Sequence, residues 1–265
     1  MSATVINEQH EFILTGGLLS DSNKALSHWY RVVLDDTFEF NKQANMISER
    51  FKHTSVYLQN CVYVIGGLHL DSIVSKPVQS TLSSCERYIN DENWWQKVAS
   101  MITPRYNMAI TTFQGIYAYC FGGYNDSTLL DTIEKYDAIL DTWVEISVTL
   151  PFKIAKLGAA ELIPDESILL WGGQYHDETA LSNTNTVYKF DLKQEKLYKM
   201  ISMNQKRTLP SLIPAIDNQI FAFGGWGDHT CEKYDKVSNK WVDISSYTSI
   251  APNYDLSDFT IVNLN

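Results

Sequence analysis

Four basic residues stand at nearly constant distances before a repeated Gly-Gly pair. Arg105 and Arg207 precede their pairs by 17 residues, and Arg50 and Lys156 precede theirs by 16. Guanidinium and ammonium groups bind carboxylates and phosphates through charge-assisted hydrogen bonds. If these four side chains face one cavity, they form a positive ring that suits a carboxylate-bearing or phosphorylated peptide.

The same basic residues also allow a structural interpretation. They can pair with nearby carboxylates such as Glu49 and hold the chain between successive repeats. A pair of that kind leaves little charge for a ligand. The sequence leaves both interpretations open, and the ligand-binding ring is rejected if charge reversal at Arg105 and Arg207 leaves partner binding unchanged.

Aromatic residues accompany the Gly pairs and the basic residues. Large amphipathic rings contribute much of the binding energy of protein interfaces. We therefore add five partner-binding candidates to the four basic residues: Tyr106, Tyr124, Tyr175, Trp226 and His229.

Residues suited to metal or nucleophilic chemistry are present, but their spacing favours neither. The six histidines, at positions 10, 28, 53, 69, 176 and 229, never stand two or four residues apart. Single cysteines without a Cys-x-x-Cys motif favour buried thiols over disulfides or zinc ligands: Cys61, Cys85, Cys120 and Cys231. We expect no catalytic residue, metal or cofactor. An enzyme or metal-dependent protein with a site in a central cavity stays open as the alternative, because folding brings distant residues together.

Gly-Gly pairs divide the chain into five repeats. Each pair closes an apolar run (EFILT, CVYVI, IYAYCF, SILLW and QIFAF), and successive pairs lie 50, 56, 50 and 52 residues apart. The pairs are Gly16 and Gly17, Gly66 and Gly67, Gly122 and Gly123, Gly172 and Gly173, and Gly224 and Gly225. No Lys-Ser/Thr and no helical pattern follow them, which argues against a phosphate-binding loop. Glycines with positive φ instead let a strand end sharply beside neighbouring backbone.

The second half of each repeat carries a further pattern. Residues 134–147 (EKYDAILDTWVEIS) and 232–245 (EKYDKVSNKWVDIS) are identical at eight of fourteen positions. In the fourth repeat, Phe190 and Leu197 replace the Tyr and the Trp. In the second repeat, the segments HTSVYLQ, CVYVIGG, SCERYIN and WWQKVA predict four short strands separated by turns.

An apolar run, a Gly pair, a Tyr and a Trp seven positions later together resemble the Kelch repeat. The matching pairs are Tyr88 and Trp95, Tyr136 and Trp143, and Tyr234 and Trp241. The resemblance covers essentially the whole chain. It implies a β-propeller, in which each repeat forms a four-stranded blade, and it implies binding to other proteins rather than catalysis.

We predict an all-β fold, a Kelch-type β-propeller with five recognisable four-stranded blades in a single domain over residues 1–265. The repeats span about 1–50, 51–103, 104–152, 153–206 and 207–250. A C-terminal strand at 257–265 either closes the ring or begins a sixth blade that other residues or a partner complete.

The net charge and the hydropathy of the chain argue against nucleic-acid binding and against membrane insertion. A formal charge of −10 repels nucleic-acid backbones, and no apolar stretch is long enough to insert into a membrane. We expect a cytoplasmic or cytoskeletal protein. Ubiquitin-ligase receptors with Kelch repeats also carry BTB and BACK domains, for which the residues before the first repeat leave no room, so an adaptor role needs another chain.

The loops after the Gly pairs differ in length from repeat to repeat, which is typical of a recognition surface on a constant frame. We therefore predict an interaction module or scaffold subunit of a larger intracellular assembly, which binds proteins, including acidic or phosphorylated peptides, cytoskeletal elements or multi-subunit complexes, through these loops.

Overall fold

The computed structural model consists of β-strands joined by short turns and loops. It describes residues 1–7, 11–19, 21, 24–34, 38–71, 78–163, 166–209, 211–215, 219–225, 230–235 and 237–245. Five four-stranded antiparallel sheets follow one another along these residues. We call them blades 1 to 5. No helix in the described residues is long and apolar enough to span a membrane.

Each blade uses four strands that are consecutive apart from short loop hairpins. Blade 1 contains β1 (Ser2–Asn7), β2 (Glu11–Thr15), β5 (Trp29–Leu34) and β6 (Phe38–Lys42). Blade 2 contains β7 (Thr54–Leu58), β8 (Cys61–Ile65), β11 (Cys85–Ile89) and β12 (Trp94–Val98). Blade 3 contains β13 (Ala109–Phe113), β14 (Tyr117–Phe121), β17 (Ile133–Asp137) and β18 (Thr142–Ile146). Blade 4 contains β20 (Gly158–Ile163), β21 (Ser167–Trp171), β24 (Val187–Asp191) and β25 (Lys196–Lys199). Blade 5 contains β26 (Ser211–Ala215), β27 (Gln219–Phe223), β28 (Cys231–Asp235) and β29 (Lys240–Asp243).

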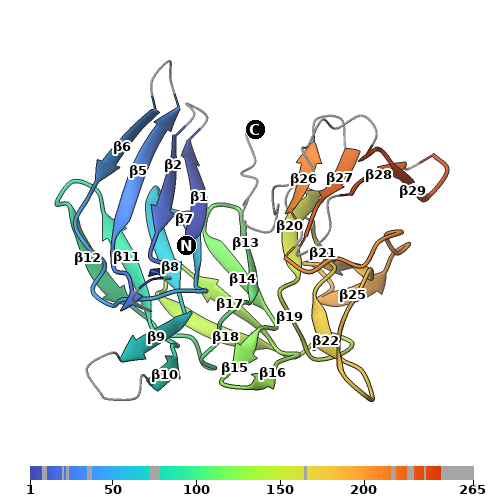
Figure 1. Cartoon of the computed structure of the whole chain (residues 1–265), viewed down its shortest axis with the longest axis horizontal. Helices are drawn as coiled ribbons and strands as arrows, with labels where there is room; N and C mark the ends of the chain where they lie inside the picture. Colours follow the sequence, from blue (N-terminus) through green and yellow to red (C-terminus); the bar gives the residue numbers. More distant parts are fainter. Residues whose placement is uncertain are drawn as a thin grey trace.

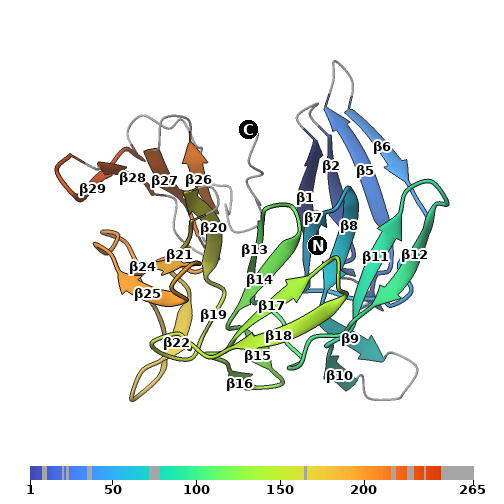
Figure 2. The same cartoon turned by 180° about the vertical axis from the view of Figure 1, so that it is seen from behind.

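The blades stand side by side around a common centre (Figures 1 and 2). The first strand of each blade lies innermost, and β1, β7, β13, β20 and β26 contact one another in that order. Over the described residues, the arc is open between blade 1 and blade 5 (Figure 1). The all-β, four-stranded-blade prediction is confirmed, and the arrangement fits a propeller. The strand predicted at 257–265 lies outside the described residues.

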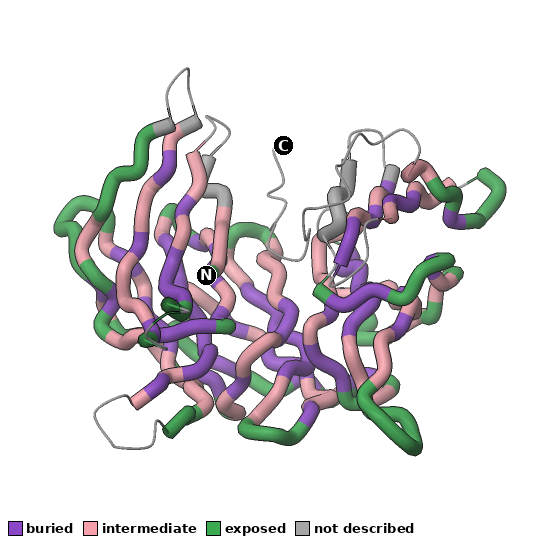
Figure 3. The backbone as a smooth tube through the Cα atoms, in the orientation of Figure 1, coloured by how far each residue is buried: buried purple, intermediate pink, exposed green. Residues whose placement is uncertain are grey.

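Burial follows the position of a strand in its blade (Figure 3). The second strand β21, with sequence SILLW, is buried at every residue, whereas the fourth strand β18 alternates between exposed and buried residues. A second strand is covered by a blade on each face and therefore reads as a continuous apolar run. An outer strand has a face in water, and its side chains alternate. The four strands predicted in the second repeat are confirmed as β7, β8, β11 and β12.

Apolar clusters between neighbouring blades form the core. At the junction of blades 3 and 4, Phe121 and Phe190 are fully buried, and their ring centroids lie 5.8 Å apart. The repeated Trp also reaches back to the preceding blade: the indole N–H of Trp143 donates to the carbonyl of Ala99 at 3.1 Å. Each blade is therefore fixed mainly by its neighbours.

The Gly pairs lie where each second strand ends against the next connection. Both glycines of all five pairs have positive φ. A Cβ atom at Gly122 would lie 2.2 Å from the carbonyl oxygen of Ile154, which leaves no room for any side chain. The amide of Gly123 donates to that same carbonyl at 2.8 Å. These contacts agree with the structural role predicted for the pairs.

Small hairpins follow four of the Gly pairs. They are β3 (Leu18–Leu19) with β4 (Lys24–Ala25), β9 (Leu68–Asp71) with β10 (Val78–Thr81), β15 (Tyr124–Asn125) with β16 (Thr128–Leu129), and β22 (Gln174–His176) with β23 (Leu181–Asn183). In the fourth repeat, the short strand β19 (Ile154–Ala155) pairs with β22. These hairpins form one end of the blades, beside the connections that enter the next blade.

Candidate functional site

The three predicted arginines are buried, so they do not form a ligand-binding ring. Arg50, Arg105 and Arg207 each have 0% exposure. The guanidinium of Arg105 donates to the carbonyl of Gly122 at 2.9 Å and ion-pairs with Glu134, which is also fully buried. A charge enclosed in this way is not available to an acidic peptide. The hypothesis of an arginine ring is wrong for these three residues.

Each arginine belongs to a repeated polar network. Glu134 accepts hydrogen bonds from the backbone amides of Ile102 at 2.8 Å and Thr103 at 3.0 Å, in the connection that carries Arg105. The carbonyl of Arg105 in turn accepts from Gly67 of the preceding blade at 2.9 Å. We call this set, an arginine, a third-strand glutamate and two backbone amides, the arginine–glutamate network. It ties each connection to the blades on both sides.

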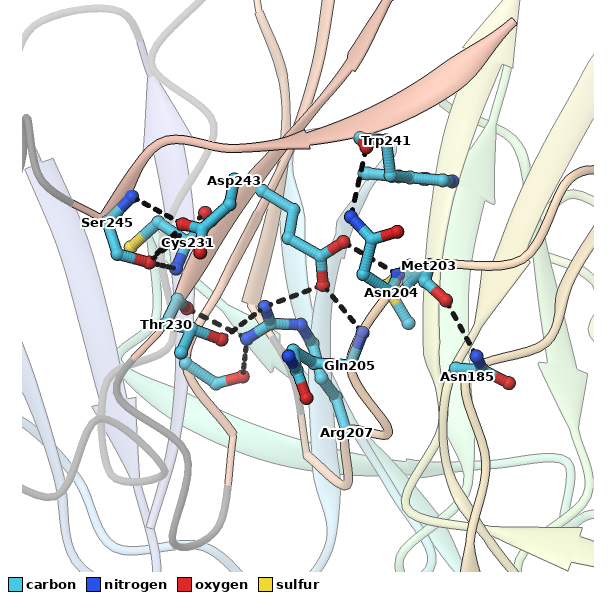
Figure 4. Close-up of polar contacts among 12 residues, drawn as sticks. Asn185, Met203, Asn204, Gln205, Arg207, Thr230, Cys231, Trp241, Asp243 and Ser245 are labelled. Carbon is cyan, nitrogen blue, oxygen red and sulfur yellow. Dashed lines mark hydrogen bonds and ion pairs between the residues drawn. The ribbon is translucent and has the colours of Figure 1, made fainter.

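The network recurs at two other junctions. Arg50 pairs with Glu86 at 2.6 Å, and Arg207 pairs with Glu232 at 2.9 Å. Figure 4 shows the last of these, where the Arg207 guanidinium also reaches Thr230. The structural interpretation of the arginines is therefore the correct one, but the expected partner Glu49 is wrong. The repeated CERY, IEKY and CEKY sequences are the signal that identifies the true glutamates.

Lys156 does not occupy the position that Arg50, Arg105 and Arg207 hold in the other connections. Ile154 does, because its carbonyl accepts from Gly123 just as the carbonyl of Arg105 accepts from Gly67. Lys156 lies two residues further on, where the backbone has a φ of 55°. The spacing to the Gly pair is misleading because the β20–β21 hairpin, residues 158–171, is longer than the corresponding hairpins of blades 2, 3 and 5.

Lys156 belongs instead to a backbone ring around the centre. Lys52, Asn107, Lys156 and Leu209 all have positive φ, and each comes from a different connection. Asn107 donates its amide to the carbonyl of Lys52 at 3.1 Å, Lys156 to Asn107 at 2.8 Å, and Leu209 to Lys156 at 2.8 Å. Sequence reasoning missed Lys52, although it stands two residues after Arg50, as Asn107 stands after Arg105.

The positive charges of Lys52 and Lys156 repel each other. Burial lowers the pKa of Lys156, and the charge of Lys52 lowers it further. Repulsion of this kind requires that the two ammonium groups share a region of space. The predicted set of four cations is thus replaced by two lysines on the inner edge of the blades.

Two predicted aromatic residues lie beside the ring. Tyr106 and Tyr124 pair through their backbones and stack with centroids 5.3 Å apart. The Tyr106 hydroxyl donates to the carbonyl of Asp126 at 2.9 Å, and the ammonium of Lys52 lies 5.6 Å from the Tyr106 ring centroid. Burial raises the pKa of both phenols, which keeps them neutral.

The remaining aromatic candidates lie elsewhere or outside the described residues. Tyr175 packs against Phe152 at 4.9 Å in the fourth repeat, and neither residue stacks on the Tyr106 pair. Trp226 and His229 are outside the described residues. We call the surface formed by Lys52, Tyr106, Asn107, Tyr124 and Lys156 the ring face.

Burial keeps three groups with reactive chemistry neutral: His53, Cys85 and Cys120. His53 accepts or donates a 2.8 Å hydrogen bond with Thr15, and burial, with a smaller contribution from Arg50, lowers its pKa well below 6.5. Burial raises the pKa of Cys85 and Cys120 to about 12. Within the described part of the chain, no group of three or more His, Cys, Asp or Glu side chains could hold a metal ion.

Buried interblade networks, Gly pairs and repeated four-stranded sheets define a repeat protein of the propeller class. The Kelch motif matches residues 104–147 and 208–246. The chain is 26% identical to Kelch-like protein 25 of Xenopus tropicalis over 239 residues, which cover 88% of this chain and 38% of that protein. It is 26% identical over 184 residues to Kelch repeat and BTB domain-containing protein 1 of cowpox virus, covering 68% of this chain and 30% of that protein.

Kelch-like protein 38 of Mus musculus is 26% identical over 209 residues, which cover 78% of this chain and 33% of that protein. The chain thus spans less than two fifths of the length of these relatives. The motif matches and these relatives support a Kelch-repeat family for this chain.

Proposed function

We propose that this chain is a protein-interaction module or scaffold subunit of an intracellular assembly, and that it binds partners through the ring face. The observation that carries the proposal is the meeting of Lys52, Lys156 and the stacked Tyr106 and Tyr124 from separate repeats. Backbone hydrogen bonds between successive connections hold these residues in place, so little conformational entropy is lost when they bind.

The chemistry of the ring face suits an acidic or phosphorylated segment. Two lysines stand on connections that are linked through Asn107, in a protein whose formal charge is −10, so the positive potential there is local. Neighbouring tyrosines add flat, amphipathic contact area. We therefore still propose an acidic or phosphorylated peptide as the ligand, with Lys52 and Lys156 in place of the arginines as the groups that bind it.

The names of the relatives extend this proposal. One relative's name combines Kelch repeats with a BTB domain. We propose that the present blades play the recognition part of such an arrangement, with any further module in the same assembly, and that the assembly is cytoplasmic or cytoskeletal. We also propose that the blades form one propeller domain, which residues 257–265 or a partner complete.

The proposal is tested with the double charge reversal Lys52→Glu and Lys156→Glu. A library of acidic and phosphorylated peptides is selected on the wild-type chain, and the affinities of the selected peptides are measured by fluorescence polarisation. We expect the double variant to bind these peptides at least about tenfold more weakly, as expected for loss of charge-assisted contacts.

The matched control is Lys97→Glu with Lys240→Glu, which changes the net charge equally at exposed residues of the outer strands β12 and β29. This control should bind like wild type. Equal weakening in both double variants would reject the ring face and would indicate a general charge effect.

A further inference from the structure

A pocket lies between blades 1 and 2, at the end remote from the Gly pairs. Its internal volume is about 80 Å³. Glu11 and Cys61, which line it, begin the strands β2 and β8 whose other ends lead into the Gly pairs. The pocket therefore opens away from the ring face. The lining residues that carry the argument are Ile13, Trp29, Arg31, Tyr57, Cys61 and Tyr88.

The pocket lies where blades 2, 3 and 5 provide an aromatic ring. Ile13 pairs with Arg31 across β2 and β5, and Tyr63 pairs with Arg87 in the same register of blade 2. The corresponding pairs are Tyr119 with Lys135 in blade 3 and Phe221 with Lys233 in blade 5. Blade 1 therefore has the cation but an aliphatic side chain in place of the ring, as does blade 4, where Leu169 pairs with Lys189.

At the later junctions, this ring packs against the following blade. The Tyr63 centroid lies 5.8 Å from that of Tyr136, and Tyr119 lies 6.0 Å from Phe190. Ile13 is smaller than a tyrosine, and the junction of blades 1 and 2 has unfilled volume beside Ile13 and Tyr88. Trp29 fills part of that volume, since its centroid lies 4.4 Å from Tyr88. The corresponding Leu169 junction of blades 4 and 5 is closed.

In the blades that have the ring, the cross-strand cation lies beside it. The ammonium of Lys135 is 5.7 Å from the Tyr119 centroid, and that of Lys233 is 5.8 Å from the Phe221 centroid. In blade 2, burial raises the pKa of the Tyr63 phenol, and the neighbouring Arg87 guanidinium opposes the rise. Arg31 keeps this position in blade 1 and pairs with Glu11 at 2.5 Å.

Trp29, which lines the pocket, has a buried hydrogen-bond donor without a partner. Trp29 is 2% exposed, and its indole N–H has no hydrogen-bond partner among the described residues. The indoles of Trp95, Trp143 and Trp241 each donate to a backbone carbonyl. Buried donors are normally satisfied, so an unused N–H beside a cavity favours a ligand or water that carries an acceptor.

We propose that this pocket binds a phenolic ring, which takes the place that Tyr63 and Tyr119 fill in blades 2 and 3. The ring would lie among Trp29, Tyr57 and Tyr88, with its hydroxyl oxygen within reach of the Arg31 guanidinium. The inference does not depend on the proposed function, because the pocket opens at the opposite end of the blades.

The first test uses p-cresol, the side chain of tyrosine as a free molecule. Saturation-transfer NMR and calorimetry should show binding at one site, with a dissociation constant on the order of 0.1 to 1 mM for a ligand of this size. 4-Methylcyclohexanol has nearly the same shape but no aromatic face, and it should bind at least about tenfold more weakly. Equal binding of the two compounds would overturn the requirement for a ring.

Two substitutions supply the missing ring from the protein itself. Ile13→Tyr copies blades 2 and 3, and Ile13→Phe copies Phe221 of blade 5. Both variants should lose p-cresol binding while keeping a cooperative thermal transition. Unchanged binding to either variant, once a melt shows that it is folded, would overturn the proposed location.

Cys61 reports on the pocket directly. It is half-buried in the lining, whereas Cys85, Cys120 and Cys231 are buried. Saturating p-cresol should slow alkylation of Cys61 by iodoacetamide at least about threefold in the wild type and should have no effect in Ile13→Tyr. An unchanged alkylation rate in the wild type would overturn the proposal.

The phenol can belong to a small molecule or to a tyrosine of a partner. N-acetyl-tyrosinamide separates these sources because it carries the peptide backbone on both sides of the ring. Protection of Cys61 by this compound as well as by p-cresol supports a partner's tyrosine, and protection by p-cresol alone supports a small phenolic molecule.

Discussion

Two kinds of blade junction occur in this protein. The junctions that lead into blades 2, 3 and 5 contain the arginine–glutamate network, whereas the junction into blade 4 is apolar. The backbone amide of Leu150 donates to the backbone carbonyl of Asp131, as the amide of Met101 donates to the carbonyl of Ser83. Leu150 and Met101 are therefore equivalent positions of the two connections. Ile154 then stands in place of Arg105, and Pro151 in place of Ile102.

The third-strand position has changed as well. Tyr188 of β24 occupies the position of Glu134 in β17, as the strand registers show. The arginine, the glutamate and one of the two amide donors are thus absent together from the junction into blade 4. Ile154 instead packs in an apolar cluster with Leu150, Leu157 and Leu170.

This difference indicates that the arginine, the glutamate and the amide donors of a buried network are retained together or replaced together. Removing one partner leaves the other charge or donor buried without compensation, which costs several kcal/mol. Replacing all partners by apolar groups of suitable shape is close to neutral. The apolar junction therefore shows that the network is one solution to joining blades, rather than a requirement of the fold.

Breaking one network should have the largest effect. Arg105→Leu leaves Glu134 buried without its cation, and we expect the free energy of unfolding to fall by about 3–5 kcal/mol in chemical denaturation. Arg31→Leu is the control, because its ion pair with Glu11 is partly exposed, and it should cost less than about 1 kcal/mol. Similar losses in both variants would contradict a special role for the buried network.

Placing a cation in the apolar junction should be nearly as harmful. Ile154→Arg buries a guanidinium opposite Tyr188, and we expect a loss of about 2–4 kcal/mol by the same measurement. Adding Tyr188→Glu should recover only part of this loss, because Pro151 has no amide proton to donate to the new carboxylate. Full recovery in the double variant would show that the amide donors do not matter.

Converting a charged junction to the apolar kind should cost less than breaking it. Arg105→Ile combined with Glu134→Tyr copies blade 4, and we expect a loss of about 1–2 kcal/mol, smaller than that of Arg105→Leu alone. A double-mutant cycle built from the two single variants measures the coupling. Additive losses would contradict the conclusion that the network acts as a unit.

The charged junction into blade 2 should also have a pH dependence. His53 lies near Arg50, and its pKa in the folded chain is lowered well below 6.5, so the unfolded chain binds a proton that the folded chain does not. Stability should therefore fall as the pH drops below 6.5, by about 1 kcal/mol between pH 6.5 and 5.5.

His53→Met places at this position the residue type that blade 3 has at Met108, beside the Gly pair of its own junction. Denaturation at the two pH values should show that this component of the pH dependence disappears. If the variant keeps the full wild-type decrease, His53 is not its source.

Much of the fold could be predicted because its signals are local. An apolar run that ends in Gly66 and Gly67 specifies a buried strand and its sharp end, and the Tyr and Trp of the following hairpin are close in sequence. These features need only a few neighbouring residues to be recognised. The direction of the Arg105 side chain is different, since Glu134 lies 29 residues away in the chain.

The candidate site was predicted in part for the same reason. Tyr106 and Tyr124 were identified, but their stacking depends on pairing between a connection and a hairpin. Lys156 was assigned to the wrong position because Ile154 stands 18 residues before Gly172, whereas Arg105 and Arg207 stand 17 and Arg50 stands 16 before their pairs. Counting residues through a hairpin of variable length does not reveal which ones are equivalent.

The sequence by itself determined the all-β repeat architecture, the strands of each blade and the role of the Gly pairs, because strand periodicity and glycine conformation are properties of short segments. Only the tertiary structure decided which cations are buried in networks, which two form the central ring, and where Ile13 leaves a pocket. Those outcomes depend on packing between blades, where residues separated by a whole repeat compete for the same space and the same hydrogen-bond partners.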